Sequence, residues 1–163
     1  MTVFYIDGQS LGNQQRGQPR QAKIAVAFKE KPNSGFQLHW EEIGDRTNNE
    51  AEYYALLKAL NMIQAKLATG EEAVSKKGMD PVKIHSDSLL IVNQVKGAYE
   101  VTDVRLRQLC DSVKSLMKKM GFVKLEWIPR EENYAGQWLE ERWKGGKLEV
   151  VRDGLPNEAV AKV

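Results

Sequence analysis

The sequence predicts an α/β fold in which helices flank a mixed five-stranded sheet, with its elements in the order βββαβααβα. Three β-rich stretches follow one another before the first helical pattern, as antiparallel hairpins do. Each later strand is preceded by a helical segment, which suits parallel addition to the same sheet. The chain has 163 residues, 42% of them hydrophobic, and can bury one sizeable core.

The three opening strands are expected at residues 3–6, 24–28 and 36–43, separated by turn-forming residues. The first apolar run stops at Asp7-Gly8, where we expect the strand to end. The segment 9–21 is rich in Gly, Gln and Arg, and is therefore expected to be a surface loop.

The central part of the chain alternates between helices and a strand. Apolar residues recur at steps of three and four over residues 50–67, which predicts a long amphipathic helix. Residues 68–80 are charged and aperiodic, and we expect a flexible connection there. Residues 82–85 form the next predicted strand, which leads through Ser86-Asp87-Ser88 into a short helix over 89–95.

The clearest helix covers residues 103–120, with one apolar stripe and a stop at Gly121. A fifth strand over 123–128, a loop over 129–133 and a last helix over 134–142 follow. We therefore expect one catalytic domain over residues 1–142. Residues 143–163 form a tail whose role the pattern does not define.

Charge and composition leave the class of partner open. Lys and Arg together number 24 against 22 Asp and Glu, so the net charge of +2 does not by itself indicate nucleic acid. Cys110 is the single cysteine, which excludes an internal disulfide framework and a Cys-rich zinc site and fits a reducing compartment. No apolar run approaches about 18 residues, and the first ten residues lack the order of a signal peptide. We expect a cytoplasmic protein outside the membrane.

Three acids stand at the ends of predicted elements, where open sheets place their sites. They are Asp7, Glu52 and Asp87. Convergent carboxylates suit magnesium or manganese, which favours phosphoryl chemistry. Each acid also has a purely structural interpretation: a turn at Asp7-Gly8, a capping box over 49–52 that ends in Glu52, and a helix N-cap at Asp87.

Four stretches on these elements carry a resemblance to a known family. They are FYIDGQSLGN, RTNNEAEYYAL, IHSDSLLIVNQVKGAYEV and WIPREENYAGQWLE. In this order they resemble ribonuclease H of type 1 over residues 3–139, and imply the ribonuclease H-like fold. The resemblance makes Asp7, Glu52 and Asp87 metal-binding catalytic residues, and gives Gln137 the position of the family's fourth acid, four residues after Asn133.

The resemblance also assigns nucleic-acid contacts. Thr47 is expected to meet a phosphate of the DNA strand, and several asparagines to face the minor groove, where amides can contact 2′-hydroxyls and base edges. Helix capping is the alternative for Asn48 and Asn49. The residues expected at the nucleic acid are Gly8, Asn13, Thr47, Asn48, Asn49 and Arg130.

The chain departs from larger members of that family in two places. Residues 96–100 lead almost directly into the 103–120 helix, so the basic handle is absent, as in the short, archaeal-like branch. Arg130 stands in the loop that often carries a mobile His, and is expected near the leaving phosphate.

Histidines and tryptophans are expected to be mostly structural. His39 and His85 lie in predicted strands and are interpreted as structural or surface residues rather than catalytic ones. Two tryptophans in strands are expected in the core, and the two in or after the last helix are possible stacking contacts. The pairs are Trp40 with Trp127, and Trp138 with Trp143.

Taken with the resemblance, the sequence predicts an endonuclease that hydrolyses the RNA strand of RNA–DNA hybrids. Two Mg²⁺ ions, with Mn²⁺ as a substitute, would be bound at the three acids, and the products would carry 5′-phosphate and 3′-hydroxyl ends. We expect a monomer whose partner is the hybrid duplex. The alternative is a weak or inactive module that binds hybrid or RNA duplexes, because Gln137 lacks the fourth carboxylate.

Overall fold

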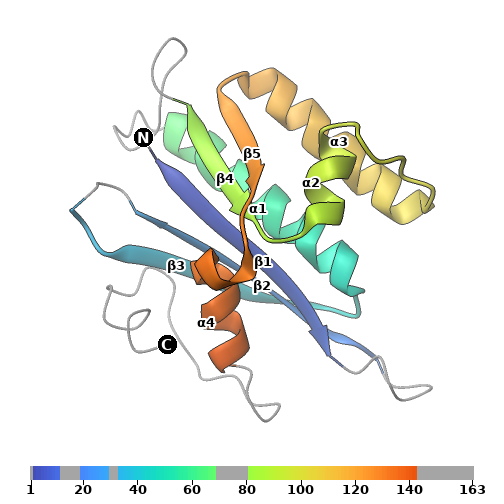
Figure 1. Ribbon diagram of the computed structural model, residues 1–163, viewed down its shortest axis with the longest axis horizontal. Coiled ribbons are helices and arrows are strands. Elements are labelled where there is room, and N and C mark those ends of the chain that lie inside the picture. The colour runs from blue at the N-terminus through green and yellow to red at the C-terminus, as the bar shows by residue number, and fades with distance from the viewer. Residues whose placement is uncertain (1, 12–18, 30–32, 69–80, 143–163) are drawn as a thin grey trace.

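Five strands form one mixed sheet in this computed structural model, which describes residues 2–11, 19–29, 33–68 and 81–142 (Figure 1). The strand order is β3-β2-β1-β4-β5; β1, β2 and β3 pair antiparallel, whereas β4 and β5 are added in parallel. The predicted fold class and order of elements are confirmed. The strands are β1 (Val3–Leu11), β2 (Gln21–Lys29), β3 (Phe36–Gly44), β4 (Val82–Ser86) and β5 (Val123–Trp127).

The first strand is longer than the sequence predicts. The expected stop at Asp7-Gly8 is wrong, because β1 stays paired with β2 through Asp7 opposite Ala25 and Gly8 opposite Ile24, as far as Leu11. Local turn propensity is outweighed here by pairing along the whole hairpin. Asp7 therefore lies inside a rigid central strand rather than at its end.

The second and third helices begin at predicted capping residues, and the third also ends at one. Ser88 accepts a hydrogen bond from the Ile91 N–H, Asp103 accepts one from the Leu106 N–H, and Gly121 ends its helix with φ of 76°. A single 3-10 turn, η1 (Arg130–Glu132), interrupts the predicted 129–133 loop. The helices are α1 (Asn48–Ala68), α2 (Leu89–Val95), α3 (Val104–Met120) and α4 (Tyr134–Arg142).

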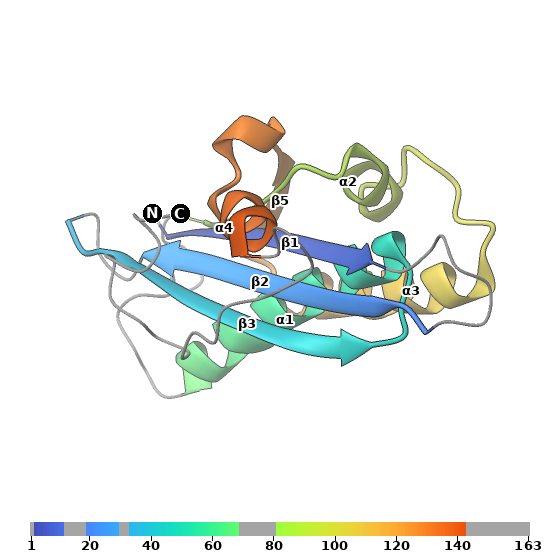
Figure 2. The same cartoon turned by 90° about the horizontal axis from the view of Figure 1, so that it is seen from below.

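Two apolar clusters hold the helices on opposite faces of the sheet (Figure 2). The larger joins α1, α2 and α3 to strand residues such as Phe4 and Ile6, and the smaller joins α4 to β2 and β3. Trp138 is fully buried in the smaller cluster, with its ring 6.2 Å from that of Trp40. The prediction that Trp138 stacks on a ligand is therefore wrong, because its ring is covered by the side chains of this cluster.

Several sequence-based expectations fall outside the described residues. These are Asn13, Trp143, most of the 68–80 connection and the tail at 143–163. Among the described helices, none combines the length and the apolar character that crossing a membrane requires.

Candidate active site

Asp7 lies on the face of β1 that α4 covers. Along β1 the side chains alternate, so Phe4 and Ile6 enter the core under α1, whereas Tyr5 and Asp7 face the other way. Asp7 is fully buried, and its Oδ2 accepts a hydrogen bond of 2.9 Å from Gln9 Nε2, two residues on along the same face. The sheet thus fixes one carboxylate in a place where water cannot fully solvate it.

Glu52 reaches this carboxylate because Gly8 lets α1 approach β1. A Cβ on Gly8 would lie only 2.2 Å from the carbonyl carbon of Ala51, so any other residue would force the helix away. Glu52, next after Ala51, is 8% exposed and interacts with Asp7. Gly8 therefore has a packing role that places the second acid.

Asp87 follows β4 directly, and the parallel pairing of β4 with β1 brings it beside Asp7. Asn133 Nδ2 donates to Asp87 Oδ2 at 3.1 Å and to the Ile6 carbonyl oxygen at 2.8 Å, which connects the start of α4 to both strands. Trp127 Nε1 donates to the backbone oxygen of Asp87 at 3.1 Å.

The three acids form a potential metal site. Each offers a carboxylate oxygen, and these oxygens all lie within 4.8 Å of one another. Asp7 Oδ1 and Glu52 Oε2 are buried and have no hydrogen-bond partner. Buried acceptors without donors are costly unless a cation completes them, and hard oxygen ligands suit a hard divalent ion. The donor set therefore fits a metal ion.

The raised pKa values of two of the acids also favour a bound cation. Burial, and then the charge of Asp87, raise the pKa of Asp7 to about 7, although Arg130, Glu52 and Gln9 oppose this shift. Burial followed by the charges of Asp7 and Asp87 also raises the pKa of Glu52. Neighbouring carboxylates in a buried place resist ionising together, and a divalent cation removes that penalty.

The structural interpretations of the three acids are all wrong. Asp7 is not in a turn, because it lies within β1. The capping box is formed two residues earlier than expected, by Thr47 and Glu50, each of whose side chains accepts the other's backbone N–H at 3.1 Å. Ser88, not Asp87, caps α2.

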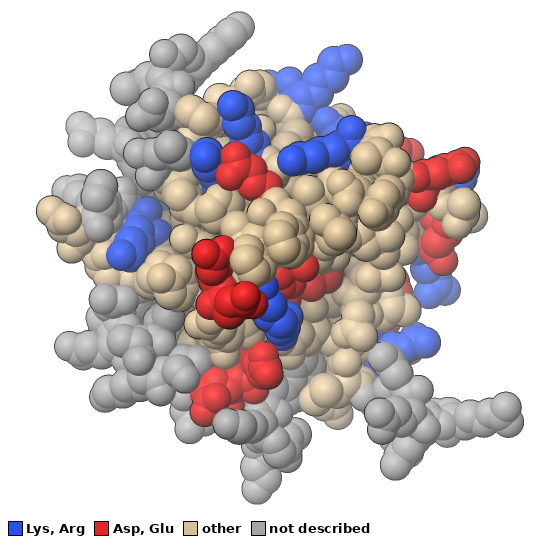
Figure 3. All heavy atoms as spheres, viewed as in Figure 1, with Lys and Arg blue, Asp and Glu red and all other residues tan. Residues whose placement is uncertain are grey.

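Arg130 partly neutralises the acids from the loop before α4. Its Nη1 lies 3.2 Å from Asp87 Oδ2 and 3.7 Å from Asp7 Oδ1, and its Nη2 lies 3.4 Å from Glu140 Oε2. Burial alone would lower the pKa of Arg130, but the charges of Asp7, Asp87 and Glu140 raise it. In the space-filling view acidic atoms gather in the middle of this face with basic atoms among them (Figure 3). With its side chain 48% exposed, Arg130 can also reach a phosphate in solution.

Gln137 does not join the acids in this structure. Its side chain is exposed and donates to the backbone oxygen of Glu131. The α4 residue that borders the site is instead Gly136, where a Cβ would lie 3.3 Å from Asp87 Oδ2 and 3.4 Å from Asp7 Oδ2. Glycine thus lets the first turn of α4 lie directly against the two carboxylates.

Three of the residues expected at the nucleic acid, Thr47, Asn48 and Asn49, lie at the start of α1, whereas Gly8 is buried in β1 against Ala51. Asn48 Oδ1 accepts the Ser10 N–H at 2.8 Å, so this exposed residue joins α1 to the end of β1 and does not cap its helix. Thr47 and Asn49 line a hollow of about 490 Å³ together with Asp103 and Arg105 from the start of α3. A ligand held in this hollow would touch both α1 and α3.

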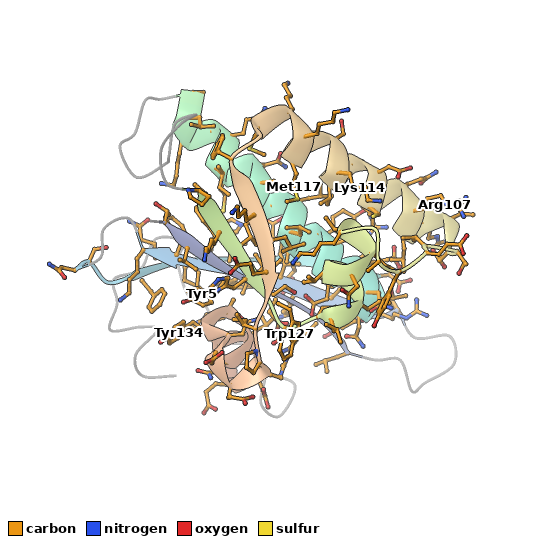
Figure 4. The ribbon with its side chains drawn as sticks, turned by 45° about the horizontal axis from the view of Figure 1, so that its top comes forward. Tyr5, Arg107, Lys114, Met117, Trp127 and Tyr134 are labelled. Atoms are coloured by element: carbon orange, nitrogen blue, oxygen red, sulfur yellow. The ribbon has the colours of Figure 1, made fainter. Side chains whose placement is uncertain are left out.

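Trp127 borders the acid cluster, whereas both histidines lie outside it. The expected burial of Trp127 is wrong: it is 46% exposed, because β5 is the edge strand and ends beside Asp87. Figure 4 shows it at that end of β5, close to α4. His39 lies 2.7 Å from Glu41 and His85 lies 3.4 Å from Glu126, and neither is in the acid cluster.

Sequence reasoning missed four residues that shape this site: Gln9, Trp127, Asn133 and Gly136. The alternation of β1 could have identified Gln9, which lies two residues after Asp7. From the sequence, Asn133 was used only to locate position 137, yet Asn133 is fully buried and donates a hydrogen bond to Asp87. Local patterns do not indicate Gly136 or Trp127, because their roles depend on how α4 and β5 meet the sheet.

Comparisons with known proteins agree with this geometry. The protein family described as reverse transcriptase-like matches residues 12–142. A curated ribonuclease HI of Halobacterium salinarum is 29% identical over 129 residues, which is 79% of this chain and 57% of that protein. A bifunctional protein of Mycobacterium tuberculosis is also 29% identical, over 74% of this chain and 30% of its own length. The chain thus spans between about a third and somewhat over half of these relatives.

Two solved structures of LC11-RNase H1 are also similar. One, isolated from compost by a metagenomic approach, is 28% identical with a TM-score of 0.65, covering 99% of this chain and 96% of the other. The second, a complex with an RNA/DNA hybrid, is 29% identical with a TM-score of 0.64, covering 82% and 88% of the two chains. With the family match over residues 12–142, these likenesses show that the chain belongs to the reverse transcriptase-like family, in the branch of the type 1 ribonucleases H.

Proposed function

We propose that this chain is an endonuclease that hydrolyses the RNA strand of RNA–DNA hybrids. The observation that carries the proposal is the buried cluster of Asp7, Glu52 and Asp87, whose carboxylate oxygens lie within 4.8 Å of one another. Such a cluster is costly without a cation, and it lies on a face where a duplex can approach. The similarity to a ribonuclease HI and to a protein crystallised with an RNA/DNA hybrid supports this substrate.

Asp7, Glu52 and Asp87 would hold two Mg²⁺ ions, with Mn²⁺ as a substitute. Ions bound there supply Lewis-acid stabilisation of charge on the phosphate and lower the pKa of water, which is the chemistry that phosphodiester hydrolysis needs. Asp7 Oδ1 and Glu52 Oε2 are the acceptors left without donors, and Gln9 and Asn133 hold Asp7 and Asp87 in place. The products would carry 5′-phosphate and 3′-hydroxyl ends.

Arg130 would bind the phosphate at the cut. Its guanidinium lies 3.2 Å from Asp87 and is half-exposed, so it can exchange its carboxylate contact for a phosphate oxygen without moving far. Positive charge there would stabilise the departing 3′-oxygen. No histidine of the described residues lies in the acid cluster to share this role.

Substrate selection would come from the residues beside the cluster. Thr47 would contact a phosphate of the DNA strand, and Asn48 and Asn49 would contact the minor groove, a role that the family resemblance also implies for Asn13. Amide groups can donate to and accept from ribose hydroxyls, which distinguishes RNA from DNA without reading a sequence. We further propose that the chain acts as a monomer in the cytoplasm, which its single, buried Cys110 fits.

The test is cleavage of labelled hybrid, RNA duplex and DNA duplex, each with Mg²⁺, Mn²⁺ or EDTA. We expect metal-dependent cutting of the RNA strand of the hybrid alone, and a loss of more than about 100-fold in the Asp7→Asn variant, which lacks a metal-binding charge. Hybrid binding should survive in that variant. Cutting by Asp7→Asn at the wild-type rate would disprove the proposed centre.

A second candidate function is hybrid or RNA-duplex binding without catalysis. It is favoured by Gln137, which stands at the position of the family's fourth acid and turns its amide toward Glu131. The same assay separates the two functions. A wild-type chain that binds the hybrid but cuts nothing with either metal would be a binding module.

A further inference from the structure

A hollow of about 350 Å³ lies away from the acid cluster, between the end of α2, the middle of α3 and the edge strand β5. Val95, Met117 and Leu125 give it apolar walls. Figure 4 shows Lys114 and Met117 on the part of α3 beside β5. The volume is at the lower end of the range of ligand pockets, about 300 to 1,000 Å³, and suits one or two aliphatic side chains.

The rim of this hollow carries positive charge that the described part of the chain does not neutralise. Lys96, Lys114 and Lys124 line it, and each is exposed and forms no ion pair with another described residue. The one acid in the lining is Glu126, and its charge is balanced by Lys83, which is not part of the lining. Oε1 lies 3.3 Å from Lys83 Nζ and Oε2 lies 3.4 Å from His85 Nε2.

Apolar walls inside a rim of lysines select the occupant. The phosphates of a nucleic-acid backbone would contact the three ammonium groups but leave the apolar walls exposed to water. A purely aliphatic group would fill the walls but leave the lysines without partners. A segment with an apolar side chain between acidic ones satisfies both, since burial of the first and charge complementarity of the second act at adjacent places.

We propose that this hollow binds an acidic segment of a partner protein. An aliphatic side chain of that segment lies between Val95, Met117 and Leu125, and its flanking carboxylates meet Lys96, Lys114 and Lys124. None of these residues belongs to the acid cluster or hydrogen-bonds to it. The partner can therefore bind while the cluster stays accessible, as a contact that recruits the protein would require.

The test uses the full chain and a short fluorescein-labelled peptide of Asp and Glu residues around two central leucines. Fluorescence anisotropy should show saturable binding that weakens with salt. Lys114→Glu combined with Lys124→Glu should weaken it by about tenfold or more, because two attractive contacts become repulsive. Met117→Asp should abolish it by placing a charge in the apolar walls.

Matched controls keep the result specific. Lys118→Glu combined with Lys119→Glu makes the same charge change at exposed positions of α3 outside the hollow, and should leave binding unchanged. A peptide with Asn and Gln in place of its acids, and one with Ser in place of its leucines, should both bind weakly. Hybrid cleavage by the Lys114 and Lys124 variants should stay at the wild-type rate, and thermal unfolding checks that each variant folds.

Three outcomes would overturn the proposal. One is the absence of saturable peptide binding by the wild-type chain, and another is an equal loss in the Lys118→Glu, Lys119→Glu control and in the Lys114→Glu, Lys124→Glu variant. The third is a fall in hybrid affinity of the Lys114→Glu, Lys124→Glu variant with peptide binding unchanged, which would assign these lysines to nucleic acid. Cleavage of the hybrid is measured separately, so failure here leaves the proposed nuclease activity standing.

Discussion

Asp7 is the residue whose environment departs most from that of an ordinary carboxylate. It is fully buried, next to two other acids, and its pKa is raised to about 7 from an ordinary value of 3.8. Because the pKa is raised in the folded state, the protonated form stabilises the fold. That contribution is present below about pH 4 and is lost as the pH rises through about 7.

In EDTA, Asp7→Asn should therefore be more stable than the wild type at pH 8, by up to about 4 kcal/mol, and nearly equal to it at pH 4. Urea unfolding at both pH values measures the difference. Mg²⁺ should stabilise the wild type at pH 8 and the variant much less. Asp111→Asn, at an exposed acid of α3, is the control and should show no such pH dependence. A constant difference between Asp7→Asn and wild type at all pH values would contradict the assigned cause.

Thr47 and Asn48 are neighbours in sequence with different structural roles. Thr47 caps α1 in exchange with Glu50, whereas Asn48 accepts the Ser10 N–H and leaves its amide NH₂ group to the surface. Each substitution by Ala should cost about 1 kcal/mol of stability, since each removes one acceptor.

Binding should distinguish the two variants. Both variants are made in an Asp7→Asn background, which prevents cleavage. Asn48→Ala should reduce the preference for binding the hybrid over the DNA duplex, whereas Thr47→Ala should lower the affinity for both duplexes equally. Anisotropy titrations with both duplexes give the ratio. If Asn48→Ala lowers both affinities equally along with the melting temperature, its role is structural rather than selective.

At the scale of elements, the first turn of α4 decides the fourth position of the site. Gly136 borders Asp7 and Asp87, and Gln137 follows it with an exposed side chain that contacts the Glu131 backbone. An acidic side chain at position 137 could turn from the Glu131 backbone toward the metal site. Position 137 is one helical turn after Asn133, and Asn133 contacts Asp87.

Gln137→Asp should therefore lower the Mg²⁺ concentration for half-maximal cleavage, by about 10-fold or more, since supporting ligands typically change metal affinity by that order. Glu141→Gln, one turn further along α4 and about 5.4 Å away, should change it little. The measurement is a metal titration of hybrid cleavage for the three proteins. An unchanged midpoint in Gln137→Asp would show that this side chain cannot reach the metals, and a collapse in Glu141→Gln would identify Glu141 as the missing acid.

The elements also show where sequence reasoning succeeds. Helix ends at Ser88, Asp103 and Gly121 were predictable because capping chemistry is local. The length of β1 was not, because Asp7-Gly8 has the composition of a turn and only pairing with β2 keeps it extended. Trp127 was expected to be buried and is exposed, whereas Trp138 was expected at a ligand and is buried. Local sequence does not predict this, because burial depends on which elements cover each side chain.

At the scale of the molecule, the order of strands explains why three distant acids could be expected to meet. Parallel pairing of β1 with β4 brings Asp7 and Asp87 together, and the absence of a side chain at Gly8 brings Glu52 to them. The acids were predictable because their motifs are spaced along these elements. The depth of burial and the approach of α4 were not, because they depend on contacts between segments more than 100 residues apart, such as Asn133 with Ile6.

The 1–142 domain stays a prediction, and the positions of the buried side chains make it testable. All the fully buried hydrophobic side chains of the described residues lie from Phe4 to Leu139, and the acid cluster and its partners lie from Asp7 to Glu140. A chain that ends after Arg142 should therefore unfold in one cooperative transition, with a midpoint within about 4 °C of the full chain, a change of about 1 kcal/mol or less. It should also keep the rate of hybrid cleavage. Calorimetry of both chains under the same metal and pH, followed by the cleavage assay, makes the comparison. A much larger fall in the midpoint would mean that residues 143–163 cover part of the core, and a loss of cleavage at an unchanged midpoint would assign them a role in binding the duplex.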